Sequence, residues 1–165
     1  VFVDAIRHMH IDNLLIVAPD MGSIKRARAY ASKLGCGLAV IDKRRAQANQ
    51  SEVMNIIGDV RGKNLVIVDD LIDTGSTFVK CTEALKAQGA ETIVGVCTHP
   101  VFSGKAVEKI GACEALTKLF VTDTIPLRTE HEKIEVVSVA GLFAEAIIRT
   151  HENQSISSLF EKAQS

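Results

Sequence analysis

The stretch that decides the fold is VIVDDLIDTGST, residues 66–77. It begins as an apolar run typical of a buried strand and ends in two adjacent carboxylates, Asp69 and Asp70. A third carboxylate, Asp73, leads into a turn of small and hydroxyl-bearing side chains, and a helical pattern begins at Thr77. A buried strand that passes through a polar turn into a helix is the repeating unit of α/β proteins.

The same alternation runs through the whole chain. Apolar runs predict strands at residues 13–18, 38–41, 65–68, 92–97, 119–122 and 134–139, and amphipathic patterns predict helices at 2–9, 24–34, 77–88, 105–110 and 141–150. Because these strands are continuously apolar, we predict an α/β fold with a parallel sheet flanked by helices on both faces. Asp42 is expected to end the second strand, and residues 43–52 are expected to form a solvated loop because they contain no large apolar side chain.

The bulk composition narrows the function classes. A length of 165 residues indicates one domain, 1–165. The net charge of −1 gives no electrostatic case for binding nucleic acid or an anionic membrane, and no apolar run has the length of a membrane span. The four cysteines contain no CxxC pair, which argues against a zinc or thioredoxin motif and favours free thiols in a reducing cytoplasm.

Polar clusters follow three of the predicted strands: residues 19–23, 42–45 and 69–77. The carboxyl ends of parallel strands meet at one edge of a sheet, and ligands of such folds bind there. In the third cluster, Thr74, Gly75, Ser76 and Thr77 precede a helix, and hydroxyl donors at a helix N-terminus suit a phosphate. Asp69 and Asp70 would repel a phosphate, so they are candidates for sugar hydroxyls or a divalent cation.

These motifs resemble a known family. VIVDDLIDTGST is similar to the phosphoribosyl diphosphate (PRPP) motif of type I phosphoribosyltransferases and of ribose-phosphate diphosphokinases. Residues 18–27 (APDMGSIKRA), 41–70 and 97–110 (CTHPVFSGKAVEKI) resemble the bacterial diphosphokinases specifically, as do 120–125 (FVTDTI) and 139–160. The resemblance implies a type I phosphoribosyltransferase-like domain. It also implies transfer of the diphosphoryl group of ATP to ribose 5-phosphate, which yields PRPP and AMP for nucleotide biosynthesis.

The resemblance assigns roles to individual residues. Asp73, Thr74, Gly75, Ser76 and Thr77 would hold the 5-phosphate, and Asp69 and Asp70 would contact the ribose hydroxyls. Asp20, Met21, Gly22 and Ser23 match the loop for the transferred diphosphate, with Asp20 as a ligand of Mg²⁺. The family usually has two glycines where this chain has Gly22-Ser23.

The resemblance also implies roles for residues outside these two segments. Lys43 and Arg45 match the catalytic cations of the family, and two cations suit phosphoryl chemistry because they stabilise charge on phosphate oxygens. Ser155 and Ser157 match a serine pair that helps to hold a regulatory phosphate or ADP at a subunit interface. ATP and ribose 5-phosphate are the implied partners, with no nucleic acid or membrane, and the full-length family forms hexamers.

The resemblance covers the second of two similar halves in the family. The first half supplies most of the adenine-nucleotide pocket, so we expect a fragment with a ribose 5-phosphate site and an incomplete ATP site. The start at Val1, inside a helical pattern without an N-cap residue, agrees with a cut chain. Two alternatives stay open: a type I phosphoribosyltransferase, and a non-catalytic PRPP-synthetase-associated regulator.

Overall fold

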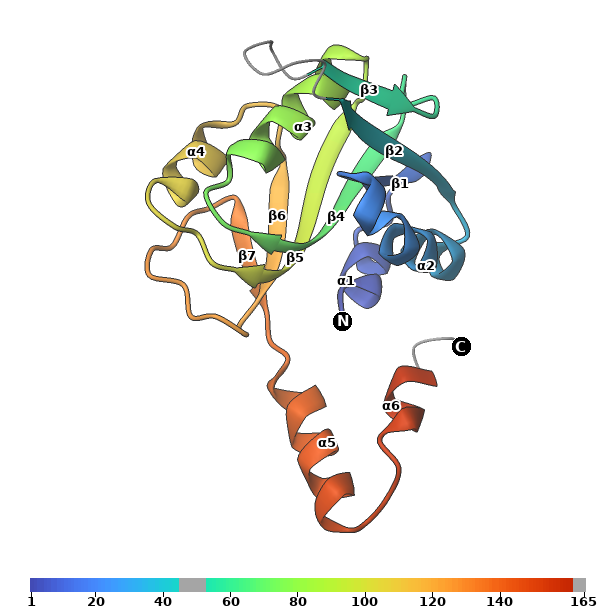
Figure 1. Cartoon of the computed structure of the whole chain (residues 1–165), viewed down its shortest axis with the longest axis vertical. Coiled ribbons are helices and arrows are strands. Elements are labelled where there is room, and N and C mark those ends of the chain that lie inside the picture. The colour runs from blue at the N-terminus through green and yellow to red at the C-terminus, as the bar shows by residue number, and fades with distance from the viewer. Residues whose placement is uncertain (45–52, 162–165) are drawn as a thin grey trace.

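The opening stretch forms the end of strand β4 (Asn64–Ile72) and the start of helix α3 (Ser76–Ala87). The computed structural model describes the backbone of residues 1–44 and 53–161 and the side chains of residues 1–42 and 54–159. β4 is the middle strand of a seven-stranded sheet with the order β3-β2-β1-β4-β5-β6-β7 (Figure 1). Its two neighbours, β1 (Leu14–Ala18) and β5 (Thr92–Pro100), run parallel to it.

The other strands extend the sheet on both sides. β2 (Gly37–Arg44) and β3 (Val53–Ile57) lie beyond β1, and β6 (Lys118–Thr122) and β7 (Ile134–Val137) lie beyond β5. The helices are α1 (Phe2–His8), α2 (Ile24–Leu34), α4 (Ala106–Ala112), α5 (Ala140–His151) and α6 (Ser157–Glu161), with a 3-10 turn, η1, at Met21–Ser23.

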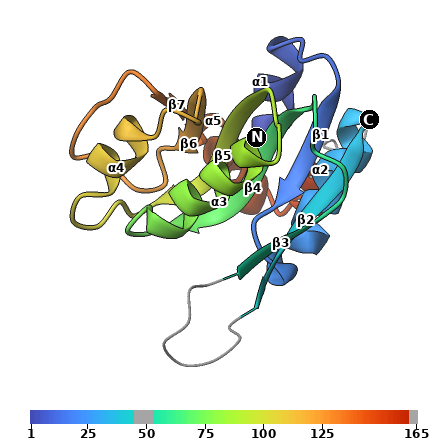
Figure 2. The same ribbon diagram turned by 90° about the horizontal axis from the view of Figure 1, so that it is seen from above.

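Helices cover both faces of the sheet, as the sequence predicts. Alternate residues of β4 point to opposite faces, and each face has its own buried cluster. Val66 and Val68 belong to the cluster that includes residues of α1 and α2, whereas Leu65 and Ile67 belong to the cluster that includes residues of α3 and α4. Figure 2 shows α3 and α4 on one side of the sheet and α1 on the other. The predicted α/β class is therefore confirmed.

Strand β4 is longer than predicted. The prediction ended it at residue 68, but the strand continues through both acids to Ile72. Its partner explains the extension, since β5 also runs on to Pro100 and pairs Asp69 with Cys97 and Ile72 with Pro100. The ladder of backbone hydrogen bonds therefore continues where the buried side chains stop, and the two acids lie within the strand.

Strand β2 also corrects a prediction. Asp42 does not end the strand, because β2 continues to Arg44 and pairs antiparallel with β3. Asp42 lies opposite Asn55, and Lys43 lies opposite Met54. The predicted loop at 43–52 therefore begins two residues too early, and its remainder, residues 45–52, lies outside the described residues. β3 was not predicted, and it makes the sheet parallel in all pairs but one.

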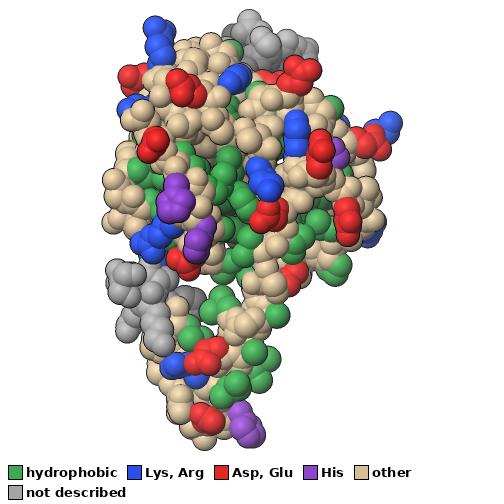
Figure 3. All heavy atoms as spheres, turned by 180° about the vertical axis from the view of Figure 1, so that it is seen from behind, with side chains coloured by type: hydrophobic (Ala, Val, Ile, Leu, Met, Phe, Trp, Pro, Cys, Tyr) green, Lys and Arg blue, Asp and Glu red, His purple; other side chains and the backbone are tan. Residues whose placement is uncertain are grey.

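Helices α5 and α6 form an arm, residues 138–161, that extends away from the sheet (Figure 1). The helix α5 is predicted correctly, yet none of its residues is buried. Its predicted apolar face is open, with Phe143 exposed by 58% and Ile147 by 66%. Figure 3 shows hydrophobic side chains on the surface of this arm. Among the described residues, every helix is too short or too polar to cross a bilayer.

Candidate functional site

The predicted site residues gather where β1 and β4 end. After β1 the chain leaves for β2 on one side, whereas β4 is followed by β5 on the other side. The carboxyl ends of such a strand pair mark the topological switch point, where ligands of open α/β sheets bind. Asp20 follows β1. Asp69 and Asp70 lie near the end of β4, and the turn at residues 73–77 follows that strand. We call this region, residues 20–23 and 69–77, the β1/β4 site.

The loop after β1 is held by reciprocal capping. The Ser23 backbone N–H donates to Asp20 Oδ1 over 2.8 Å, and the Asp20 N–H donates to Ser23 Oγ over 3.3 Å. Gly22 leaves room for this arrangement, since a Cβ there would lie 3.3 Å from Asp20 Oδ1. Ser23 adopts φ −86°, which any residue accepts, so the serine in place of a second glycine causes no backbone strain.

The two acids at the end of β4 have different partners. Asp69 Oδ1 accepts a hydrogen bond from the Asp70 backbone N–H over 2.9 Å. Asp70 Oδ2 accepts one from Arg26 Nη2 over 2.7 Å, and this contact is an ion pair. Arg26 lies in α2, the helix that directly follows the Asp20 loop. The ion pair therefore joins the two halves of the β1/β4 site.

These partners separate the pKa values of the two acids. Burial, together with the neighbouring charges of Asp70 and Asp20, raises the pKa of Asp69 to about 6. Partial burial acts to raise the pKa of Asp70 as well, but the Arg26 guanidinium and the hydrogen bonds that Asp70 accepts together outweigh it, and the pKa lies below its usual value. Burial and the charge of Asp69 raise the pKa of Cys97 to about 12, so this thiol stays protonated and is no nucleophile.

The turn between β4 and α3 offers hydrogen-bond donors. Gly75 is the N-cap of α3 with φ 73°, a left-handed conformation that favours glycine. It gives the helix no side-chain cap, so the N–H groups of the first turn remain for a ligand. Hydrogen bonds from the segment between β5 and α4 hold this turn in place. The Ser103 N–H donates to the Asp73 carbonyl, and the Phe102 N–H donates to the Ile72 carbonyl.

Two side chains that the sequence analysis missed contact this site. One is Arg26, already described, and the other is Lys109 of α4, whose Nζ donates to Ser76 Oγ over 2.8 Å. Both come from helices far along the chain from the residues that they contact. Both residues lie in stretches that resemble the diphosphokinases, 18–27 and 97–110, but no role was assigned to either one, since each contact depends on how a helix packs on the sheet.

The structure describes only part of the predicted catalytic pair, Lys43 and Arg45. Lys43 lies in β2, and its side chain is outside the described residues, as is the whole of Arg45. Their catalytic roles stay predictions. Ser155 lies in the turn between α5 and α6, and Ser157 begins α6. The Ser157 N–H donates to Ser155 Oγ over 3.1 Å, and Arg149 donates to the Ser155 carbonyl. Their regulatory role also stays a prediction.

For metal binding, the described residues contain no group of three or more His, Cys, Asp or Glu side chains arranged around one ion. A single carboxylate such as Asp20 still suits Mg²⁺, which usually keeps several waters and is bound through one or two carboxylates and substrate phosphates. The residues at the β1/β4 site therefore fit an ion that arrives with a phosphate ligand, and they do not fit a site made by protein side chains alone.

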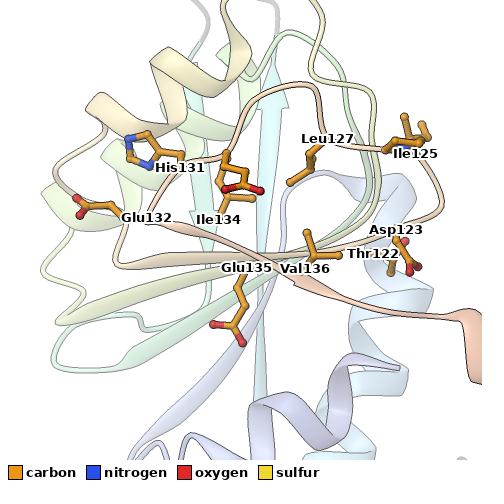
Figure 4. Close-up of a pocket in the computed structure, with 11 residues that line it drawn as sticks. Thr122, Asp123, Ile125, Leu127, His131, Glu132, Ile134, Glu135 and Val136 are labelled. Atoms are coloured by element: carbon orange, nitrogen blue, oxygen red, sulfur yellow. The ribbon is translucent and has the colours of Figure 1, made fainter.

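A separate hollow of about 570 Å³ lies beside the edge strand β7 (Figure 4). Its lining includes Thr122, Leu127, His131 and Val136, and none of the predicted site residues. Asp123 at its rim accepts hydrogen bonds from Ser138 Oγ and from the Val139 N–H, which fixes the base of the arm. We assign the ligand site to the β1/β4 region because the donors, acids and cations converge there.

Comparison with known proteins identifies the family of this chain. The family described as the phosphoribosyl synthetase-associated domain matches residues 45–161. The chain belongs to this family. The resemblance of the sequence to ribose-phosphate diphosphokinases is thereby confirmed, since curated relatives of the family carry that activity in their names.

Two such relatives are the ribose-phosphate pyrophosphokinases of Wolinella succinogenes and Campylobacter jejuni. Each is 51% identical over 160 residues, which is 97% of this chain and 52% of the relative. The family member described here therefore spans about half the length of the curated relatives that it matches.

Solved structures agree on the fold. The phosphoribosylpyrophosphate synthetase of Mycobacterium smegmatis superposes with a TM-score of 0.85 at 31% identity, covering 92% of this chain and 50% of that chain. A purine phosphoribosyltransferase of Pyrococcus horikoshii has a TM-score of 0.53 at 23% identity, covering 84% of this chain and 82% of that one. The second likeness concerns the fold alone, and it agrees with the predicted type I phosphoribosyltransferase-like architecture.

Proposed function

We propose that this chain provides the ribose 5-phosphate site and the diphosphate loop of a ribose-phosphate diphosphokinase. Such an enzyme transfers the diphosphoryl group of ATP to the 1-hydroxyl of ribose 5-phosphate and releases AMP. The observation that carries the proposal is the order of groups at the β1/β4 site. An acid pair and a turn of donors lie on one strand end, and the Asp20 loop lies at the end of the neighbouring strand.

The two ends of the sugar phosphate would meet opposite chemistry. The 5-phosphate binds the N–H groups and hydroxyls of residues 73–77, where a helix N-terminus favours an anion. The ribose hydroxyls donate to Asp69 and Asp70, which accept hydrogen bonds but repel phosphate. Arg26 neutralises Asp70 and so lowers the negative charge that an incoming phosphate meets.

The remaining parts of the reaction need cations. Mg²⁺ bound by Asp20 would neutralise charge on the transferred phosphate oxygens. We retain Lys43 and Arg45 as the residues that stabilise the transferring group. The adenine pocket, the hexamer and the regulation through Ser155 and Ser157 belong to the proposal for the longer enzyme, of which the relatives show about twice this length.

Isothermal titration calorimetry with ribose 5-phosphate tests the proposal on the chain itself. We expect binding by the wild-type chain and a loss of at least about tenfold in Asp70→Asn, because a charge-assisted acceptor of the ribose hydroxyls is removed. Glu83→Gln is the matched control, since Glu83 is an exposed acid on α3 away from the turn.

A second assay separates the reaction classes. We expect little AMP release from ATP by the chain alone, because it spans only about half the length of its curated relatives. If the chain binds no ribose 5-phosphate, the proposal is wrong. If it consumes PRPP with a purine or pyrimidine base, the proposal is also wrong, and a phosphoribosyltransferase becomes the better assignment.

A further inference from the structure

Lys109 reaches the turn of the β1/β4 site from α4, outside the stretch of residues 66–77. It lies in α4, and its Nζ donates to Ser76 Oγ over 2.8 Å. Ser76 is the first residue of α3, and the N-cap of this helix is Gly75. Gly75 lies against α4, since a Cβ added to it would be 3.4 Å from the Ala106 carbonyl oxygen. The close approach at Gly75 therefore brings the Lys109 ammonium group to the N-terminus of α3.

This position is electrostatically unfavourable without a ligand. The N-terminus of a helix carries a partial positive charge, and a cation there loses stability where an anion would gain it. The first turn of α3 contains no acidic residue that could offset the ammonium. Among the described side chains, Lys109 forms no ion pair, whereas Lys105 of the same region pairs with Glu108 at 4.0 Å.

The hydrogen-bonding groups gathered here are ready to donate. The Lys109 ammonium has three donors and spends one on Ser76, and the Ser76 hydroxyl accepts that bond and keeps its own hydrogen. The N–H groups of the first turn of α3 have no side-chain cap. Several donors and a positive charge at a helix N-terminus, with no acid in the first turn of α3, describe a site for an anion with several acceptor oxygens.

We propose that Lys109 binds the 5-phosphate of the sugar phosphate, together with the turn at residues 73–77. This inference rests on the proposed function and adds a residue from α4 to its ligand contacts. Lys109 then supplies the positive charge that the turn itself lacks, since residues 73–77 contain one acid and no base.

Calorimetry with ribose 5-phosphate tests this role. We expect Lys109→Met to weaken binding by about tenfold, which corresponds to about 1.4 kcal/mol. Lys109→Arg keeps the charge and should stay within about threefold of the wild type. Lys105→Met is the matched control, since it removes a lysine one turn earlier, and we expect less than a twofold change.

Thermal melting without ligand distinguishes binding from a structural role. If Lys109 serves a ligand, Lys109→Met melts at the wild-type temperature or above it, because an uncompensated charge has been removed. If Lys109 only holds Ser76 in place, the variant melts lower, which overturns the inference. Lys109→Gln, which keeps a donor without charge, replaces the methionine variant if that variant fails to fold.

The two levels of the proposal fail differently. Equal affinity of the wild type and Lys109→Met overturns the role of Lys109 and leaves the proposed function intact. A wild-type chain that binds no ribose 5-phosphate overturns the proposed function and this inference together.

Discussion

Asp69 and Asp70 are neighbours in sequence but have different electrostatic environments. Arg26 compensates Asp70 directly, whereas Asp69 receives a backbone N–H and is more deeply buried. The pair therefore carries less negative charge near pH 6 than two exposed aspartates would. The proposed binding of a phosphate beside two acids would benefit from this arrangement, because the repulsion between ligand and protein is reduced.

The raised pKa of Asp69 predicts how stability depends on pH. The pKa is 3.8 in the unfolded reference and about 6 in the folded chain, so the folded state holds more protons between these values. Stability therefore falls as pH rises through this window, and the full penalty is present above pH 6. Asp69→Asn should raise the free energy of unfolding at pH 8 by about 1–2 kcal/mol, after discounting for solvent screening.

Urea denaturation at pH 8 and pH 4 measures this effect. We expect the gain to shrink towards zero at pH 4, because Asp69 is then largely protonated in the folded state and carries no charge to remove. Asp59→Asn, an exposed aspartate outside the site, is the control. A gain that is the same at both pH values would show that charge burial is not its cause.

The sequence predicts those site residues that lie on one continuous segment of the chain. The acids, the glycine turn and the helix start are all encoded within residues 66–77, and the structure brings them together as predicted. Arg26 and Lys109 could not be found in this way. Arg26 contacts a residue 44 positions away and Lys109 one 33 positions away, so their roles depend on helix packing.

Among the elements, strand β5 and helix α3 pack tightly against each other at Gly95. A Cβ added there would lie 2.4 Å from Phe78 Cζ and 2.7 Å from Leu119 Cδ1, and both side chains are buried. Gly95→Ala should therefore destabilise the fold by about 1–3 kcal/mol, because the buried Phe78 ring has no free space to move into. Chemical denaturation of the purified variant measures this loss.

Gly141 provides the matched control in the same chain. It lies near the start of α5, and a Cβ there would meet nothing within 4 Å. Gly141→Ala should be neutral or stabilising by up to about 1 kcal/mol, because alanine loses less backbone entropy in a helix. Similar losses for the two variants would show that the close packing at Gly95 is not responsible.

The bounds of the helices and strands show where side-chain patterns no longer predict secondary structure. Helix α2 was predicted at its observed bounds, because its amphipathic pattern ends at a glycine in the left-handed conformation. The ends of β2 and β4 were not, since polar residues continue both strands by pairing with β3 and β5. β3 was missed because its alternating pattern is short: Met54 and Ile56 pack against the core, and the exposed Asn55 interrupts the apolar run between them.

For the molecule as a whole, the arm is the part that contributes least to the core. Ile147 is 66% exposed, so Ile147→Glu should change the melting temperature by less than about 2 °C. We also expect weaker binding of the dye ANS, because an exposed apolar patch is interrupted. A large drop in melting temperature would contradict the exposed placement of α5.

Leu85→Ala is the control for this prediction. Leu85 of α3 is fully buried, and its truncation should cost about 2–5 kcal/mol. Calorimetric melting of both variants under one condition compares arm and core directly. ANS binding that stays unchanged in Ile147→Glu would show that the arm is not the apolar surface that the dye detects.

The position of the site between β1 and β4 has a consequence for synthesis on the ribosome. β1 pairs with β4 through Leu14 and Asn64, and every residue of the β2–β3 hairpin is made between them. The Asp20 loop therefore leaves the exit tunnel long before the strand that completes its surroundings. Until Thr77 has emerged, a nascent chain has the Asp20 loop without the turn at residues 73–77, so the sugar phosphate that we propose as the ligand could not help it to fold. Folding assisted by this proposed ligand would thus be restricted to chains whose central strand has already been translated.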